Sequence, residues 1–231
     1  PLDIIDDRDI PLTCSANGFT VTWVGHSSVY TCLGGLSILT DPIWSHRASP
    51  ISWAGPKRYT PPGLAFDELP DIDVVLISHD HYDHLDKRTL KQLGNRPLYI
   101  VPLGVGKVIE KFGITNYQEL DWWDKAVYGG VTFTCTPAQH FSGRSLFSKN
   151  ETLWCGWAAH SPAGSFFFGG DTGYFEGFKD IGRRLGPFDI AMLPIGAYLP
   201  EWMMSPVHIG PDQAVNISRE LNASILMPIH W

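Results

Sequence analysis

Short apolar runs recur along this chain between polar segments that contain glycine and proline. Residues 73–78, 131–135, 165–168 and 224–227 are four such runs, and their β-branched and aromatic residues are typical of buried strands. Each run is followed within a few residues by a histidine or an aspartate. The pattern therefore predicts several buried strands with polar side chains gathered at their carboxyl ends.

Helical signals are weaker and lie between or after these runs. Residues 87–93 follow a capping residue at Asp86, and residues 105–112 have the apolar spacing of a helix. Residues 211–221 begin with proline, which is favoured at the first helical position. Two glycines at 129–130 separate apolar runs and predict a hairpin turn.

The chain shows no linker, low-complexity segment or repeat, so we expect one domain spanning residues 1–231. Residues 50–70 contain five of its 18 prolines and predict a long surface loop. The chain begins at Pro1 without methionine and stops one residue after His230. A functional residue beside a fraying terminus would be unusual, so we expect the core of a longer protein, trimmed at both ends.

Composition narrows the class of protein. At 231 residues and 44% hydrophobic, the chain can bury a sizeable core. It has no apolar run of about 18 residues and no visible signal peptide, so we expect a location in the cytoplasm or peripheral to a membrane, without a transmembrane segment. A net charge of −7, from 17 basic and 24 acidic residues, argues against a nucleic-acid partner. The four cysteines form no Cys-x-x-Cys pair, and we expect buried, reduced thiols.

The most informative segment is residues 78–86, Ser-His-Asp-His-Tyr-Asp-His-Leu-Asp. His79 and His81 are two positions apart, so on an extended backbone their side chains point the same way. Asp83 and His84 follow directly, and three of the nine histidines thus fall within six residues. Imidazole and carboxylate groups suit zinc and similar divalent ions, and this run predicts a metal site.

One run cannot complete two metal sites, and the other strand-like runs supply further groups. His140, Asp171 and His230 follow the runs at 131–135, 165–168 and 224–227. A single aspartate after a strand is often only a helix cap. Helix capping does not explain why several strand-like runs are each followed by a histidine or an aspartate. Because α/β sheets gather their active sites at the carboxyl ends of strands, we expect these side chains to meet.

The segment His79-Asp80-His81-Tyr82-Asp83-His84 resembles the His-x-His-x-Asp-His signature of the metallo-β-lactamase fold. More narrowly, the chain resembles the N-acylphosphatidylethanolamine-hydrolysing phospholipase D family from about residue 20 to its end. The matching segments are residues 22–28, 39–42, 47–50, 55–58, 120–123, 136–140, 166–174 and 193–198. The resemblance implies an α/β (α+β) fold, a four-layer αββα sandwich.

The resemblance also implies how the metal ligands divide. One ion would be held by His79, His81 and His140, and a second by Asp83, His84 and His230. Asp171 would bridge the pair. Two divalent ions, zinc in the first instance with iron or manganese left open, would then present a hydroxide for hydrolysis of a phosphodiester.

His208 lies just before the predicted helix at 211–221 and matches a histidine that the resembled family places near its substrate. Together with Asp83 it is a candidate catalytic residue, because an imidazole can protonate a leaving oxygen. A helix-capping or surface role is the alternative. His26, His46 and His160 have no ligand-like context, and we expect them to be structural or surface residues.

The segment 198–204, Tyr-Leu-Pro-Glu-Trp-Met-Met, is apolar and follows a strand end on the expected active-site face. Tyr198, Leu199, Trp202 and Met203 are therefore candidate substrate-binding residues, which could line a lipid groove, contact a membrane peripherally or simply pack. The leading hypothesis is phospholipase D-type cleavage of N-acylphosphatidylethanolamine to N-acylethanolamine and phosphatidic acid.

Two alternatives remain open. One is a soluble metal-dependent hydrolase of the same fold, acting on a lactone or sugar-phosphate ester; the other is a non-catalytic metal-binding scaffold. A groove with apolar walls would favour the lipid, whereas arginine and lysine side chains converging on the metals would favour a soluble anion. A homodimer is also left open.

Overall fold

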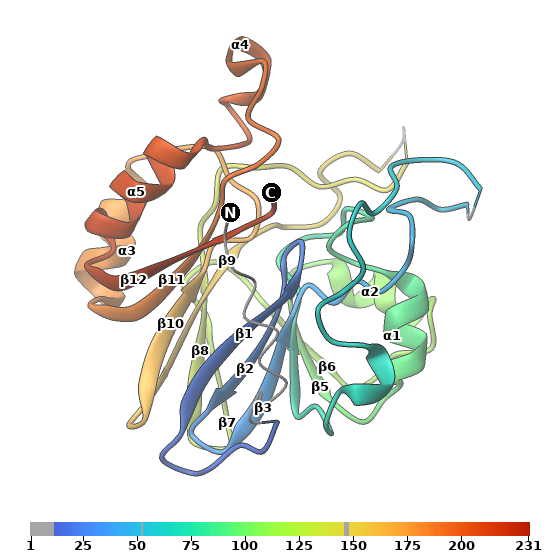
Figure 1. Ribbon diagram of the computed structural model, residues 1–231, viewed down its shortest axis with the longest axis horizontal. Helices are drawn as coiled ribbons and strands as arrows, with labels where there is room; N and C mark the ends of the chain where they lie inside the picture. The colour runs from blue at the N-terminus through green and yellow to red at the C-terminus, as the bar shows by residue number, and fades with distance from the viewer. Residues whose placement is uncertain (1–11, 52, 146–147) are drawn as a thin grey trace.

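The computed structural model describes residues 12–51, 53–145 and 148–231 and contains two six-stranded sheets (Figure 1). The first sheet has the order β1-β2-β3-β4-β5-β6. Its first three strands pair antiparallel, and β3 to β6 pair parallel. The strands are β1 (Phe19–Gly25), β2 (Ser28–Leu33), β3 (Leu36–Thr40), β4 (Val74–Leu76), β5 (Leu98–Pro102) and β6 (Tyr117–Leu120).

The second sheet has the order β12-β11-β10-β9-β8-β7. Strands β7 to β10 pair antiparallel, and β10, β11 and β12 pair parallel. The strands are β7 (Lys125–Tyr128), β8 (Val131–Thr136), β9 (Gly156–Ser161), β10 (Gly164–Phe168), β11 (Phe188–Pro194) and β12 (Ala223–Ile229). Gly129 and Gly130, with φ of 54° and 83°, form the predicted hairpin turn between β7 and β8.

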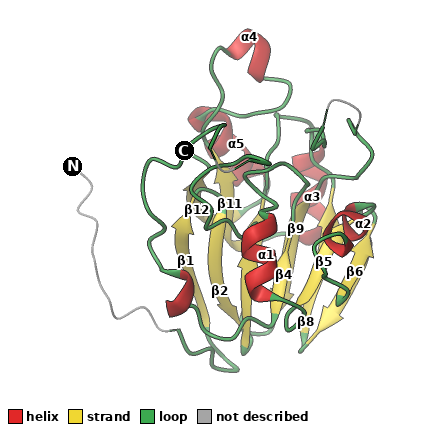
Figure 2. Ribbon diagram, turned by 90° about the vertical axis from the view of Figure 1, so that its right-hand side faces the viewer, coloured by secondary structure: helices red, strands yellow, loops and turns green. Residues whose placement is uncertain are grey.

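Helices cover the outer face of each sheet (Figures 1 and 2). Helices α1 (Lys87–Leu93) and α2 (Val105–Glu110) lie against the first sheet, and α3 (Gly177–Leu185) and α5 (Pro211–Glu220) lie against the second. The three predicted helices match α1, α2 and α5 closely. The short α4 (Glu201–Met204) projects from the body, and η1 (Phe66–Glu68) lies within the proline-rich loop.

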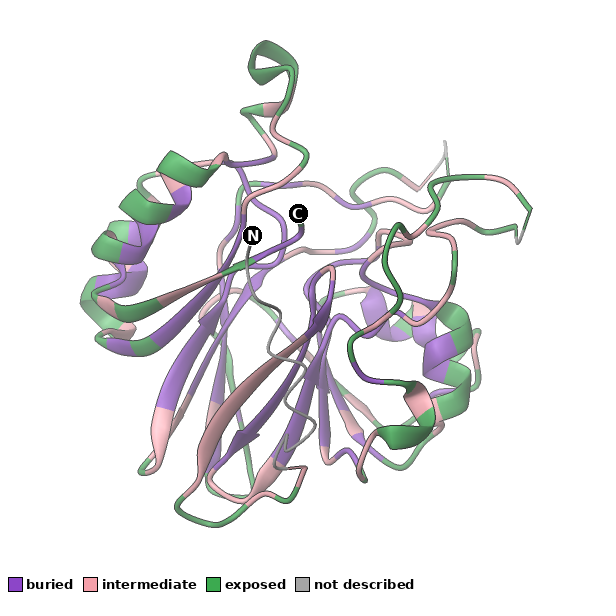
Figure 3. Ribbon diagram, in the orientation of Figure 1, coloured by how far each residue is buried: buried purple, intermediate pink, exposed green. Residues whose placement is uncertain are grey.

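The inner faces of the two sheets pack on each other through large side chains. Phe133, Trp157, Phe166 and Phe168 of the second sheet are fully buried against aliphatic residues of the first. The indole Nε1 of Trp157 donates to the carbonyl oxygen of Ile77 at 2.9 Å, which joins the sheets directly. Figure 3 shows burial along both sheets and exposure on the outer surfaces of the helices. This arrangement is the predicted αββα sandwich.

One prediction about the cysteines is wrong. Cys14 and Cys32 form a disulfide with their Cα atoms 5.1 Å apart, whereas Cys135 and Cys155 are free and buried. The bridge joins the segment before β1 to β2 across 18 residues. Sequence spacing did not reveal it, because the two residues become neighbours only when the N-terminal segment packs beside the β1–β2 hairpin.

Candidate metal centre

The predicted ligands come from strand ends of both sheets. The segment 79–84 follows β4 of the first sheet, whereas His140, Asp171 and His230 follow β8, β10 and β12 of the second. The structure brings all of them together at one end of the sandwich. The centre therefore forms across the boundary between the sheets, and its geometry depends on their packing.

The two sheets approach closely beside this centre. The amide of Cys155, directly before β9 of the second sheet, donates to the carbonyl oxygen of Ser78 at 2.9 Å. Gly170 has a φ of +56°, and a Cβ added there would lie 2.6 Å from the Cβ of Ser78. Glycine is needed at this turn both for its backbone conformation and for its lack of a side chain.

Three imidazoles form the first cluster. His79 Nε2 and His140 Nε2 lie 2.9 Å and 3.3 Å from His81 Nδ1, so three ring nitrogens face a common point. Ligands about 2.0–2.1 Å from a tetrahedral zinc ion are about 3.3 Å apart. The spacing of the three nitrogens therefore fits a small divalent ion.

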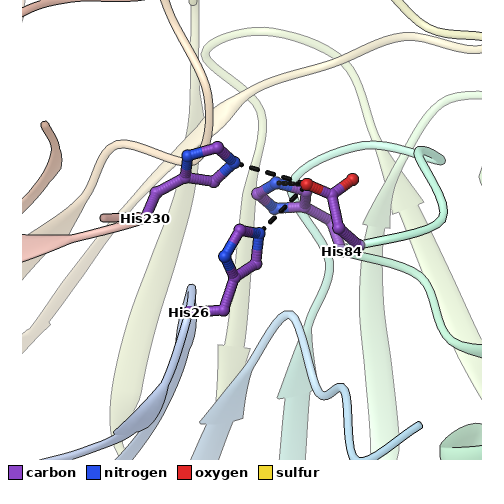
Figure 4. Close-up of side chains that lie close together, drawn as sticks. His26, His84 and His230 are labelled. Carbon is purple, nitrogen blue, oxygen red and sulfur yellow. Dashed lines mark hydrogen bonds and ion pairs between the residues drawn. The ribbon is translucent and has the colours of Figure 1, made fainter. Parts of the chain in front are cut away.

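A second cluster surrounds Asp83 (Figure 4). Its Oδ2 lies 3.5 Å from His84 Nε2, 3.4 Å from His230 Nε2 and 3.0 Å from His26 Nε2. Figure 4 shows the three imidazoles turned towards this carboxylate from separate parts of the chain. One carboxylate oxygen and three imidazoles form a second possible ligand set.

Asp171 lies between the clusters. Its Oδ2 is 3.3 Å from His84 Nε2, 3.2 Å from His230 Nε2 and 3.9 Å from His140 Nε2. The same oxygen thus contacts ligand candidates of both groups. This position suits the bridging role that the family resemblance implies.

Several buried atoms of the centre form no well-aligned hydrogen bond among the described residues: His84 Nε2, His230 Nε2, Asp171 Oδ1 and His208 Nδ1. The first two lie 3.3 Å and 3.2 Å from Asp171 Oδ2 without the alignment of a hydrogen bond. An unpaired buried polar atom costs about 1–3 kcal/mol, so a concentration of four in one place calls for a partner. Cations between the two clusters would supply it. The residues present therefore fit a metal centre.

Hydrogen bonds behind the cluster orient two of the imidazoles. Ser78 Oγ donates to Asp41 Oδ2 at 2.5 Å and can therefore accept from His79 Nδ1 at 2.9 Å. His84 Nδ1 donates to the same Asp41 oxygen at 2.7 Å. These bonds hold one proton on Nδ1 of each ring, so that Nε2 is the nitrogen that would be left free to bind a metal.

Sequence reasoning gave Asp41 no role. The signal was present, because Asp41 directly follows β3, as the other polar residues of the centre follow their strands. Its carboxylate is fully buried, and burial raises its pKa, while His84 and Ser78 act in the opposite direction. Asp41 therefore acts on the centre through the rings that it holds.

The prediction that His26 lacks a ligand-like context is also wrong. His26 lies in the turn between β1 and β2 with a φ of 54°, and its ring lies 4.2 Å from that of His230, centroid to centroid. Its carbonyl oxygen accepts from the amide of His230 at 3.0 Å. His26 directly follows the end of β1, and this position in the sequence could have indicated a place at the centre. His160, by contrast, hydrogen-bonds to the carbonyl of Leu185, outside the centre.

His208 lies beside the predicted ligands. Its Nδ1 is 3.9 Å from Asp171 Oδ2, and its ring lies 5.2 Å from that of His140, centroid to centroid. The preceding residue, Val207, accepts from His140 Nδ1 at 2.9 Å, which leaves His140 Nε2 facing the cluster. His208 is therefore placed to contact a group bound at the centre.

The histidines of the centre fall into two groups, one with lowered and one with raised pKa values. Burial, aided by neighbouring imidazoles, holds the pKa of His79 well below its usual value, and burial lowers the pKa of His140 to about 4. Burial also disfavours charge on His84 and His230, but Asp171 and other carboxylates outweigh it. They raise the pKa of His84 well above its usual value and that of His230 to about 9. The carboxylates thus attract positive charge.

A cavity of about 580 Å³ opens over the centre. His26, His81, Asp83 and His230 form its base. Its walls include apolar side chains and two cations, namely Trp23, Ile43, Tyr59, Trp231, Lys57 and Arg58. The candidate substrate-binding residues Tyr198, Leu199, Trp202 and Met203 do not line this cavity.

Replacing Asp41 should weaken metal binding without removing a ligand. In Asp41→Asn an amide NH2 replaces one of the two accepting oxygens, so the side chain cannot keep all three hydrogen bonds that Asp41 accepts from the Ser78 amide, Ser78 Oγ and His84 Nδ1. The rings then lose their fixed orientation. Loss of such a partner typically lowers metal affinity about 10- to 100-fold. Competition with a chromophoric chelator measures the change, and Asp67→Asn, an exposed aspartate in η1, is the matched control. Equal affinities in the two variants would contradict the orienting role.

In the metal-free protein, His140 should make stability depend on pH. Its pKa of about 4 lies below the value of 6.5 for the unfolded chain, so the unfolded state takes up the proton first. The contribution of His140 is therefore most favourable above pH 6.5 and is lost towards pH 4, by about 3 kcal/mol. Urea unfolding after chelator treatment should show a smaller loss in His140→Gln. Parallel losses in both proteins would exclude His140 as the cause.

Two phospholipases are similar in sequence to this chain over most of its length. The chain is 44% identical over 230 residues to N-acyl-phosphatidylethanolamine-hydrolyzing phospholipase D 1 of Caenorhabditis elegans, covering 94% of this chain and 65% of the relative. It is 37% identical over 246 residues to the mitochondrial N-acyl-phosphatidylethanolamine-hydrolyzing phospholipase D of Saccharomyces cerevisiae, covering 99% and 52%. The chain thus spans between about half and two thirds of the length of these relatives.

A solved structure of Igni18, described as a novel metallo hydrolase of Ignicoccus hospitalis, superposes with a TM-score of 0.68 at 20% identity. The superposition covers 92% of this chain and 82% of that one, and supports the fold. The sequence profile described as "Beta-lactamase superfamily domain" matches residues 37–231. That match includes both ligand clusters except His26, and the chain therefore belongs to the beta-lactamase superfamily.

Proposed function

We propose that the protein is a metal-dependent phosphodiesterase that cleaves N-acylphosphatidylethanolamine to N-acylethanolamine and phosphatidic acid. The observation that carries the proposal is the position of Asp171, whose Oδ2 contacts imidazoles of both clusters. Two ligand sets joined by one carboxylate suit a pair of divalent ions. Similarity to two phospholipases of this name supports the substrate class.

The proposed ligands of one ion are His79, His81 and His140. Those of the other are Asp83, His84 and His230, with Asp171 between them, and zinc is the proposed metal. Such a pair, when bound, supplies Lewis acidity that activates water and stabilises charge on a phosphoryl group.

The chain's own residues have separate tasks. Asp41 and Ser78 hold the protons of His84 and His79 on Nδ1, away from the centre. Burial lowers the pKa of His208, so its imidazole is neutral near pH 7 and one ring nitrogen carries a proton. We assign this N–H a hydrogen bond to the leaving oxygen of the substrate, which stabilises the negative charge that develops there as the ester bond breaks; water supplies the proton that the leaving alkoxide finally takes up.

The cavity over the centre favours a substrate with both apolar and anionic parts. Trp23 and Trp231 stack with their ring centroids 5.0 Å apart and contribute apolar surface to it. Lys57 and Arg58 line the same cavity and can interact with a phosphate. The aromatic walls favour a lipid substrate. The two cations are also compatible with a soluble anionic ester, which is the alternative substrate.

The projecting helix α4 is suited to contact a membrane. Leu199, Trp202 and Met203 are 65%, 79% and 52% exposed, although they are apolar. Figure 1 shows α4 beyond the end of the sheets where the C-terminal residue lies, the end that carries the cavity. No helix among the described residues is long and apolar enough to cross a membrane. Because these apolar side chains are exposed and do not line the cavity, we assign them to peripheral insertion into a membrane.

The proposed reaction is tested by turnover. Metal-loaded protein should release N-acylethanolamine and phosphatidic acid from N-acylphosphatidylethanolamine, and a chelator should abolish the activity until divalent metal is restored. A panel of lactones and sugar-phosphate esters, measured in parallel by mass spectrometry, should remain intact. Hydrolysis of the panel with no cleavage of the lipid would assign the protein to the soluble-ester alternative.

Trp202→Ser should impair turnover of lipid in vesicles but spare a soluble diester such as bis-p-nitrophenyl phosphate. Burial of a large apolar side chain contributes roughly 1.5–3 kcal/mol, or about ten- to a hundredfold in kcat/KM on vesicles. Tyr128→Ser is the control, because Tyr128 is an exposed aromatic residue in β7, away from α4. Equal losses on both substrates would show that Trp202 supports the fold rather than the membrane contact.

A further inference from the structure

A second cavity of about 280 Å³ lies beside the one over the metal centre. Ser45 and Tyr82 line both cavities and form their common wall. The second cavity contains none of the proposed metal ligands. Residues from separate parts of the chain form it instead: Ser45, His46, Arg47, Ser49, Pro50, Ile51, Tyr82, Leu85, Asp86, Lys87, Arg88, Phe112 and Arg144. Arg47, Ser49 and Pro50 belong to the Arg-Ala-Ser-Pro segment at 47–50, which the metal centre does not use.

Four lysine and arginine side chains line this second cavity: Arg47, Lys87, Arg88 and Arg144. Its one carboxylate, Asp86, is already engaged. Asp86 accepts from the amides of Ser45 and Arg88, each at 3.1 Å, and from Thr89 Oγ1 at 2.6 Å. The cavity therefore has an excess of positive charge in a chain whose net charge is −7.

None of these cations forms a close ion pair among the described residues, although Asp80 and Asp86 attract Arg144 electrostatically. Within the described part of the chain, no carboxylate forms a salt bridge with any of the four. Cations elsewhere on the surface do pair, for example Lys179 with Glu176 at 2.6 Å. Four like charges around one concavity repel each other, and an anion between them would relieve that repulsion.

Arg144 is held in place at the cavity. Its Nη1 donates to the carbonyl oxygens of Asp80 and Leu85 at 2.6 Å and 2.9 Å, and its guanidinium lies 4.0 Å from the centre of the Tyr82 ring. The side chain is only partly exposed, and burial lowers its pKa. A guanidinium fixed in this way loses little conformational entropy when it binds an oxyanion.

We propose that this second cavity is an anion-binding site for a phosphate monoester group, separate from the metal centre. The arginine forks match phosphate oxygens, and a doubly charged group complements several cations better than a single carboxylate does. The volume is just below the roughly 300 Å³ at which pockets for larger ligands begin, so the site suits a headgroup and not acyl chains. The ligand is either free phosphate or the headgroup of an anionic phospholipid.

The site is tested with the double variant Arg47→Gln/Arg88→Gln in the metal-loaded protein. Its control is Lys91→Gln/Arg219→Gln, which removes the same charge from exposed positions that line neither cavity. Inorganic phosphate, titrated calorimetrically, should bind the double variant at least about tenfold more weakly than the parent and the control. Phosphate held only by the metals would bind all three proteins equally, and that result overturns the proposal.

The source of the phosphate group is distinguished with vesicles. Phosphatidylcholine vesicles with and without phosphatidic acid are sedimented with each protein. Selective loss of binding to the phosphatidic acid vesicles in the double variant identifies a lipid headgroup. Loss of phosphate binding with unchanged sedimentation identifies a soluble ligand. Hydrolysis of bis-p-nitrophenyl phosphate, measured alongside, reports on the metal centre and so tests the proposed function separately.

Discussion

The buried carboxylate of Asp41 is the interaction on which the metal centre depends. It lies at the end of β3 and accepts hydrogen bonds from Ser78 and His84 at the end of β4. Through Ser78 it also determines which nitrogen of His79 carries the proton. One buried carboxylate thus orients imidazoles of both ligand clusters. A shift of Asp41 would therefore displace ligands in both clusters.

The packing of one sheet on the other is the second requirement. Segment 79–84 belongs to the first sheet, whereas His140, Asp171 and His230 belong to the second. The aromatic core between the sheets therefore sets the distances between ligands as well as the stability of the fold. Metal binding would in turn join the sheets at their open end, so we expect folding and metal affinity to be coupled.

Charge is distributed unevenly around the active-site end. Carboxylates concentrate at the centre, where they attract cations. In the part of the chain that the structure describes, the cations of the neighbouring cavity form no salt bridges. The net charge of −7 conceals this separation. A total charge describes behaviour at long range, but recognition of a ligand depends on the local arrangement of charges.

Local patterns in the sequence determined the strand-rich core, three helices, the β7–β8 turn and the ligand-type residues at strand ends, because periodicity and motif spacing are properties of neighbouring residues. The layering came from the family resemblance. Only the tertiary structure showed the roles of Asp41 and His26, the disulfide of Cys14 with Cys32, and the exposure of Trp202 outside the cavity. These features join positions distant along the chain, and contacts of that kind exist only once the sheets, turns and loops have packed together.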